Sequence, residues 1–354
     1  MTRQKSEACG ASCTLPPVAD VRRITSLAFA LCAGVAACRC SPAPHGNVGP
    51  STEGSVAIAP MKTAGPSAST SPAASDSAAL DTDTGCPAAL AETRRGGTRP
   101  GAYVAPTEAQ RRAAHAAVAK LLRGESVGDV AAFGFEVVPL EGWGDAMLLR
   151  EVADQRRGGG AYVVRKGGSS TLVVQAPHTF FDEGTFPLAC ELFQRTRARA
   201  LFINTVHRYK AAPQTSDGKH PSDMAHAAAS TFQSATEAAV EVVPRVSVVQ
   251  LHGFADRQLG GRAVVSSGEK RGGSPHVARV ARALEEIVGP RILKYPEDTS
   301  ELGATTNVQG AIVRRAGGQF LHIEMADGLR RDLLRDAALR AKVLDALAAA
   351  LAGP

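Results

Sequence analysis

The chain has 354 residues, a formal net charge of +6 and an isoelectric point near 9.0. Aromatic residues make up only 5% of it, and the lysines and arginines are scattered along the chain. This composition argues against the interleaved basic and stacking side chains that bind single-stranded nucleic acid, so we expect no nucleic-acid partner.

The segment 21–38 reads VRRITSLAFALCAGVAAC, in which two arginines precede an apolar stretch and small residues run into Cys38. Such a pattern is typical of a secretory signal, and its end resembles a bacterial lipobox, in which the cysteine is acylated. We therefore expect residues 1–38 to be a leader and signal peptide and Cys38 to be the lipid anchor of an exported envelope protein. A retained transmembrane helix is less favoured because about 20 apolar residues are needed to span a bilayer, and a buried core helix is the remaining alternative.

The region 39–100 is rich in Ser, Ala, Pro, Thr and Gly and has few large apolar residues. Such a segment cannot bury enough surface to offset its ordering entropy, so we predict a disordered tether. A single domain is then expected over 101–354. Two cysteines follow the anchor region, Cys86 and Cys190. One disulfide between them is an alternative, but a buried free thiol is favoured for Cys190 because it lies in an apolar helical pattern.

The elements of the domain follow from its hydrophobic periodicity. A helix is predicted from near Pro106, with Thr107 as a cap. Short separations between the first apolar runs favour antiparallel pairing, and later strands alternate with longer helical patterns. We therefore predict an α/β fold with a mixed, mostly parallel sheet and helices on both faces. Strands are expected at 133–140, 146–152, 161–167, 171–177, 200–206, 246–252, 262–268, 291–296 and 319–325, and further helices at 185–197, 222–241, 275–288 and 328–352.

Polar residues that bind metals follow two of the predicted strands. The first ends at His178, and Asp182 and Glu183 come four and five residues later; the second ends at His252. Ligands of open α/β sheets gather beyond the carboxyl ends of strands, and a catalytic zinc is often held by two histidines and a carboxylate. We predict one zinc ion bound by His178, Glu183 and His252, with Asp182 orienting His178. The sequence leaves open which of the two carboxylates points inward.

A carboxylate in an apolar strand needs a partner or a purpose. Glu324 lies near the end of the run QFLHIEM. Beside zinc and water it would act as a general base, so we predict Glu324 to be the catalytic residue.

The run HTFFDEGT at 178–185 resembles the histidine and glutamate spacing of phage-type poly-γ-glutamate hydrolases and, more loosely, of N-formylglutamate amidohydrolases and zinc carboxypeptidases. The resemblance covers roughly 170–326 and implies a carboxypeptidase-like α/β fold and hydrolysis of C–N bonds. The carboxypeptidase signature has its glutamate three residues after the histidine, where this chain has Phe181, so the substrate class does not carry over.

Other polar groups are candidates for binding substrate. Asn204, His207 and Arg208 follow a predicted strand, and Arg208 would clamp a carboxylate; Arg262 is a weaker candidate. The segment HPSDMAH at 220–226 has His220, Asp223 and His226 at three-residue spacing, which would suit a metal. A helix cap by Ser222 or Asp223 is the favoured interpretation there, and a gating or substrate-contact role of His226 stays open.

These patterns together predict a monomeric zinc-dependent hydrolase of peptide or γ-glutamyl amide bonds. Two alternatives stay open. One is a non-catalytic binding lipoprotein on the same scaffold, and the other is a serine hydrolase that uses Ser266 or Ser267, although no G-x-S-x-G elbow, with its serine between a predicted strand and a predicted helix, is present.

Overall fold

The computed structural model describes residues 85–256 and 259–353. The predicted lipid anchor Cys38, the predicted leader and most of the predicted tether lie outside the described residues. Among the helices that are described, none is both long enough and apolar enough to cross a bilayer.

One mixed sheet organises the domain, with strands in the order β1-β2-β3-β5-β4-β6-β9-β7-β8. The strands β5, β4, β6 and β9 at its centre are parallel to one another, whereas β1, β2 and β3 pair antiparallel and β7 runs antiparallel to β9. The bounds are β1 Phe135–Pro139, β2 Ala146–Glu151, β3 Ala161–Arg165, β4 Leu172–Ala176, β5 Ala200–Ile203, β6 Ser247–Phe254, β7 Ala263–Ser266, β8 Ile292–Lys294 and β9 Gln319–Ala326.

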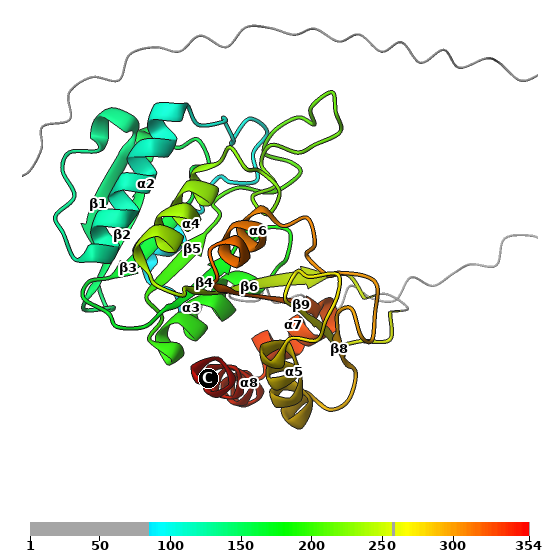
Figure 1. Ribbon diagram of the computed structural model, residues 1–354. Helices are drawn as coiled ribbons and strands as arrows, with labels where there is room; N and C mark the ends of the chain where they lie inside the picture. The colour runs from blue at the N-terminus through cyan, green and yellow to red at the C-terminus, as the bar shows by residue number, and fades with distance from the viewer. Residues whose placement is uncertain (1–84, 257–258, 354) are drawn as a thin grey trace, which may run out of the picture. The chain divides into compact units, whose positions relative to one another are not determined.

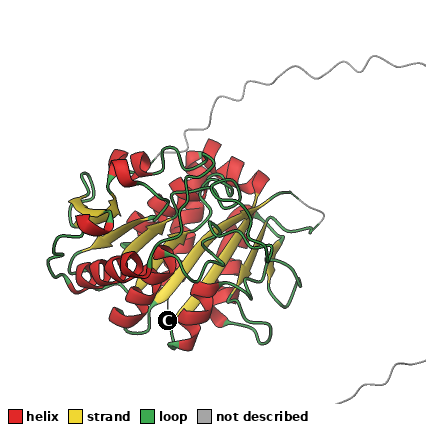
Figure 2. Cartoon of the chain, turned by 90° about the horizontal axis from the view of Figure 1, so that it is seen from above, coloured by secondary structure: helices red, strands yellow, loops and turns green. Residues whose placement is uncertain are grey.

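Helices cover both faces of this sheet (Figures 1 and 2). Helices α3, α5, α7 and α8 pack on one face, and α2, α4 and α6 pack on the other. Because the central strands are covered on both sides, they read as continuous apolar runs rather than as alternating patterns. The helices are α1 Ala88–Thr93, α2 Glu108–Arg123, α3 Thr185–Thr196, α4 Thr231–Val242, α5 Pro275–Val288, α6 Val308–Arg315, α7 Asp327–Arg335 and α8 Ala337–Ala352.

The predicted α/β class and mixed sheet are confirmed, and each predicted strand is present. Thr107 caps α2 in a reciprocal capping box with Gln110. The helix predicted at 222–241 begins later, at Thr231, where Ser230 supplies the cap. The last helical pattern is divided at Asp336, whose side chain accepts hydrogen bonds from the first residues of α8. Helices α1 and α6 were not predicted.

A disulfide joins Cys86 to Cys190, so the prediction of a free thiol at Cys190 is wrong. Cys190 lies in α3 and is fully buried, while the segment that carries Cys86 packs against the same helix. Leu90 of α1 is also fully buried. Residues 85–100 are therefore part of the domain, and the predicted tether extends too far toward the C-terminus.

Candidate metal centre

The first part of the site is a turn between β4 and α3. The backbone N–H of Asp182 donates to the His178 carbonyl oxygen at 2.8 Å, and Gly184 continues the chain with a φ of 89° before α3 begins. This single helical turn places the Asp182 side chain back beside His178, whereas the next residue, Glu183, is exposed. Arg330 holds the turn from outside, since its Nε donates to the Glu183 carbonyl oxygen at 2.7 Å.

The second part comes from two neighbouring parallel strands. His252 of β6 lies opposite Glu324 of β9, and two residues earlier in each strand Gln250 lies opposite His322. Side chains two residues apart in a strand share a face, so these four polar groups line one face near the carboxyl ends of the strands. All four residues are buried.

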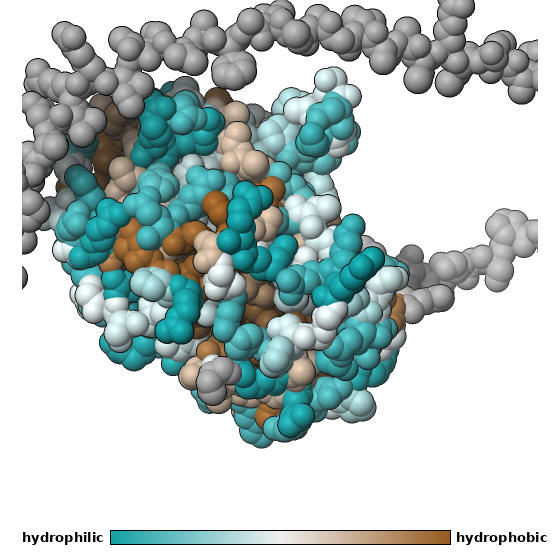
Figure 3. Space-filling model, viewed as in Figure 1, coloured by the Kyte–Doolittle hydropathy of each residue, from teal (hydrophilic) through white to brown (hydrophobic). Residues whose placement is uncertain are grey.

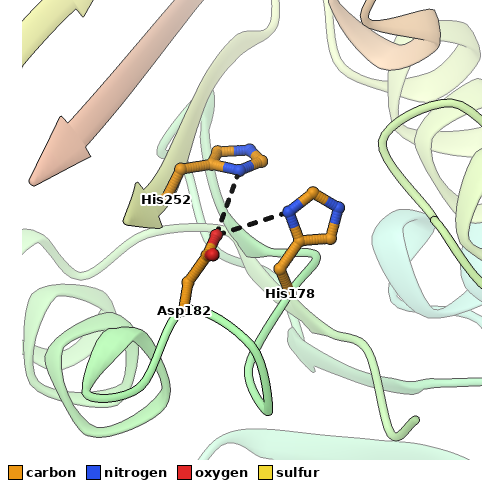
Figure 4. A group of neighbouring side chains, drawn as sticks. All are labelled: His178, Asp182 and His252. Carbon is orange, nitrogen blue, oxygen red and sulfur yellow. Dashed lines mark ion pairs between the residues drawn. The ribbon is translucent and has the colours of Figure 1, made fainter. Parts of the chain in front are cut away.

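His178, Asp182 and His252 converge as a ligand set (Figure 4). Asp182 Oδ2 lies 3.3 Å from His178 Nδ1 and 3.4 Å from His252 Nδ1. Neither Asp182 oxygen has a hydrogen-bond partner, although the residue is only 1% exposed. A buried carboxylate without a donor is costly, and two imidazole nitrogens and one carboxylate oxygen are a common zinc ligand set. The residues present therefore fit a zinc ion.

Each histidine has its Nε2 occupied by an acceptor, which leaves Nδ1 as the atom that can bind a metal; in His178 this atom also lies 3.1 Å from Arg208 Nη1. His178 Nε2 lies 2.8 Å from Asp223 Oδ1, and His252 Nε2 lies 3.0 Å from Gln250 Oε1. Both oxygens accept, so the histidines donate through Nε2–H. A donating Nε2–H leaves Nδ1 as the lone-pair nitrogen, which is the form that binds a metal.

The amide of Gln250 belongs to a buried network beneath the site. Gln250 Nε2 donates to Gln175 Oε1 at 2.7 Å, and Gln175 Nε2 donates to Thr236 Oγ1 at 3.0 Å. Thr236 in turn donates to the Phe232 carbonyl oxygen of α4 at 3.0 Å. Gln175, Gln250 and Thr236 are fully buried, so the acceptor that faces His252 is held in place by the core itself.

The pKa values of the site reflect both burial and close charges. Burial acts to raise the pKa of Asp182, but contacts with His178 and His252 outweigh it and hold this pKa well below its usual range. Burial likewise acts to lower the pKa of His178, and the carboxylates of Asp182 and Asp223 reverse that effect and raise it. For His252 burial prevails and lowers the pKa to about 4.

The pKa of Glu324 is raised, in contrast to that of Asp182. Burial, followed by the nearby charge of Asp182, raises its pKa to about 8. Its Oε1 lies 3.5 Å from His322 Nε2, and its Oε2 has no hydrogen-bond partner. A carboxyl group whose pKa lies near neutral pH can both accept and donate a proton at that pH, as general acid–base chemistry requires.

Arg208 contacts both His178 of the ligand set and Asp223, the residue that holds His178. Its Nη1 is 3.1 Å from His178 Nδ1, and its Nη2 donates to Asp223 Oδ2. Arg208 lines the same pocket of about 350 Å³ as His178, His252 and Glu324. A guanidinium at this position can bind a substrate carbonyl oxygen or carboxylate.

The structure brings together His178, His252, Glu324 and Arg208 of the residues selected from the sequence. Glu183 is not among them: the expectation that it faces the metal is wrong, because the turn directs its side chain into solvent, and Asp182 has the position expected for Glu183.

The other substrate-binding candidates have structural partners. Asn204 Nδ2 donates to the carbonyl oxygens of Pro177 and Val206, which fixes the segment leading to His178. His207 Nδ1 accepts from the backbone N–H groups of Tyr209 and Lys210. Arg262 does not face the site, since it binds Asp332 and the Val288 carbonyl oxygen.

Two further sequence-based interpretations change. Asp223 is not a helix cap; it holds His178 and Arg208 and also contacts His226. Ser266 donates to the Gly303 carbonyl oxygen at 2.7 Å, so its hydroxyl is not held by a histidine. Gly253 of β6 gives room to the Arg330 guanidinium, because a Cβ at this position would clash with its Nη1.

Sequence reasoning missed His322, Gln250 and Arg330. The period-2 spacing of His322 and Glu324, and of Gln250 and His252, was the available indication, because residues two apart in a strand share a face. Arg330 had no comparable indication, since the carbonyl oxygens of Glu183 and Phe254 that it binds are far away in the sequence.

No protein-family model matches the chain. A comparison with curated proteins gives no match either. Among solved structures, the chain is similar to a bacteriophage poly-gamma-glutamate hydrolase, with 15% identity over 55% of this chain and 89% of that chain and a TM-score of 0.35. It is also similar to an N-formylglutamate amidohydrolase from Ralstonia eutropha JMP134, with 12% identity over 55% and 97% of the two chains and a TM-score of 0.35. A metallo-carboxypeptidase from Burkholderia cenocepacia shares 14% identity over 70% and 69%, with a TM-score of 0.37. These are the kinds of protein that the sequence pattern resembles.

Proposed function

We propose that this chain is a zinc-dependent hydrolase of amide bonds in peptides or γ-glutamyl compounds. The observation that carries the proposal is the buried set His178, Asp182 and His252, whose ligand atoms lie within 4.8 Å of one another. Glu324, whose Oε2 has no hydrogen-bond partner, lines the same pocket as the two histidines. When bound, zinc supplies a Lewis acid that activates water and polarises a carbonyl group.

Three residues of the chain have the remaining roles, which are proton transfer, binding of the substrate oxygen and positioning. Glu324 takes the proton from the attacking water and gives it to the leaving nitrogen, because its Oε2 has no competing donor. Arg208 binds the oxygen that gains negative charge at the reacting carbonyl, or a carboxylate of the substrate. Asp223 keeps both His178 and Arg208 in place through its two oxygens.

The test combines metal content with hydrolysis. The purified full chain should bind one zinc ion per molecule and hydrolyse members of a panel of α-peptides, N-acyl amino acids and γ-glutamyl peptides. Glu324→Gln should keep its zinc and lose activity by about 10²- to 10⁴-fold, the usual contribution of acid–base catalysis. Wild-type activity in Glu324→Gln would remove its assigned role. Zinc binding with no hydrolysis by the wild type would favour a non-catalytic binding protein.

We further propose that the protein is exported and anchored through Cys38. The signal pattern of residues 21–38 supports this, and so does the disulfide between Cys86 and Cys190, because disulfides persist mainly in oxidising compartments. Mass analysis of membrane fractions should find a mature chain that begins with acylated Cys38. A soluble product that begins elsewhere would contradict the proposal.

A further inference from the structure

A second cavity, of about 800 Å³, lies beside the catalytic pocket. The two share His226 and Thr306, which line both. His226 Nε2 and Thr306 Oγ1 are 3.2 Å apart, and His226 Nδ1 is 3.2 Å from Asp223 Oδ2. The wall between the two spaces is thus made of two side chains in contact, contributed by two different loops.

The chain itself crosses from one space to the other. Arg208 lines the catalytic pocket, and the next residue, Tyr209, lines the second cavity. The Arg208 guanidinium carbon lies 4.7 Å from the centroid of the Tyr209 ring, which is 39% exposed. A substrate bound at Arg208 would therefore lie next to the exposed part of this aromatic side chain.

The lining of the second cavity is mostly apolar. Tyr103, Tyr209, Pro221 and the run Ala227–Ala229 contribute to it. The loop between β5 and α4, green to yellow-green in Figure 1, projects at the upper right of that view, and its outer surface is hydrophilic in Figure 3.

Its charged groups are already paired. Lys219 is the single lysine or arginine among the described residues that line the cavity, and its Nζ lies 2.6 Å from Asp217 Oδ2. Asp223 is held by His178 and Arg208. A polyanion such as polyglutamate would find little positive charge here, whereas an apolar segment would find matching surface.

We propose that this cavity binds apolar side chains of an extended peptide whose reacting amide lies in the catalytic pocket. This inference rests on the proposed function and narrows its substrate class to peptides with apolar residues next to the cleaved bond. The His226 and Thr306 contact marks the boundary between the reacting group and the recognised segment. The volume of the second cavity lies within the range of about 300–1,000 Å³ that is typical of ligand sites.

Binding and hydrolysis are measured separately in the test. Isothermal titration calorimetry with the zinc-loaded full-length Glu324→Gln protein compares a pentapeptide of alternating alanine and phenylalanine with γ-linked pentaglutamate. The apolar peptide should bind about tenfold more tightly, equivalent to 1.4 kcal/mol. Equal or tighter binding of pentaglutamate would overturn the inference.

Two variants locate the binding. Ala228→Trp, which fills the cavity, should weaken binding of the apolar peptide about tenfold, while Ala338→Trp on the exposed start of α8 should not change it. Tyr209→Ala gives a second route if the tryptophan variant does not fold, and should weaken binding several-fold. Unchanged affinity in a folded cavity variant would also overturn the inference.

Hydrolysis by the wild type separates the two proposals. Tight binding of the apolar peptide without its hydrolysis would leave the cavity assignment standing and remove the proposed activity. Hydrolysis with the same KM in wild type and Ala228→Trp would support the proposed activity and remove the cavity assignment.

Discussion

Replacing Asp182 by asparagine should remove most of the zinc affinity, whereas Glu183→Gln should leave it unchanged. The two residues are neighbours in the sequence, and each substitution replaces a carboxylate by its amide. Asp182 is 1% exposed and its Oδ2 faces both histidine Nδ1 atoms, but Glu183 lies in solvent. The pair therefore tests the position of the ligand with a matched control.

The expected size of the loss follows from the role of the carboxylate. Mutating groups that merely orient zinc ligands lowers affinity 10- to 100-fold. Asp182 would supply the negative charge of the ligand set itself, so its loss should exceed that range and reach at least about 100-fold, or roughly 3 kcal/mol. The asparagine keeps the shape of the turn, because the turn is made by the backbone N–H of residue 182 and the His178 carbonyl oxygen.

The assay is competition for zinc against a chromophoric chelator at pH 7.5, with thermal unfolding of the metal-free proteins as a control for folding. Full-strength zinc binding by a folded Asp182→Asn variant would refute the assignment of this ligand. Loss of binding in Glu183→Gln would show that the turn has a different orientation in the zinc-bound protein.

Three further predictions follow from the same structure. Arg208→Ala should lower kcat/KM about 100-fold or more with zinc content kept, as for other groups that stabilise a developing oxyanion, and Arg208→Lys should recover part of it; unchanged steady-state kinetics would rule the role out. In metal-free protein, the free energy of unfolding of the wild type should fall as pH rises from about 4.5 to about 8, because the folded chain keeps the Glu324 proton that the unfolded chain releases. Urea unfolding in EDTA should show that the free energy of unfolding of Glu324→Gln lacks this fall with pH. If the free energies of unfolding of wild type and variant changed with pH in parallel, the burial of the carboxyl would be contradicted. Replacing Cys86 and Cys190 by serine should lower the free energy of unfolding by about 4.7 kcal/mol, since the crosslink closes a loop of 104 residues. Dithiothreitol should lower the free energy of unfolding of the wild type by the same amount and leave that of the serine variant unchanged.

The strand positions could be predicted from the sequence because their signal is local. A buried central strand such as β4 is a short apolar run bounded by turn residues, and this pattern needs no knowledge of its neighbours. The strand order could not be predicted in the same way. Strand β5 lies between β3 and β4 although it follows both in the chain, and such pairing depends on helix packing over long sequence separations.

The candidate site could be predicted only in part. His178 and His252 come together because carboxyl ends of parallel strands meet at one edge of a sheet. The choice between Asp182 and Glu183 depended on one backbone hydrogen bond in a turn, which residue types do not encode. Asp223 was interpreted as a helix cap because its segment lies in an irregular loop, where sequence periodicity carries no information on side-chain direction.

The buried amides beneath the metal centre have a direction. A backbone carbonyl can accept a hydrogen bond but not donate one, so the Thr236 hydroxyl must donate to the Phe232 carbonyl oxygen. The Thr236 oxygen then accepts from Gln175 Nε2, and Gln175 Oε1 in turn accepts from Gln250 Nε2. The proton of His252 is thereby confined to Nε2, several side chains away from the group that decides it. Moving that proton to Nδ1 would require both amides to turn over together inside a packed core. The protein thus carries its metal-ready tautomer as a property of its interior, set before any ion arrives.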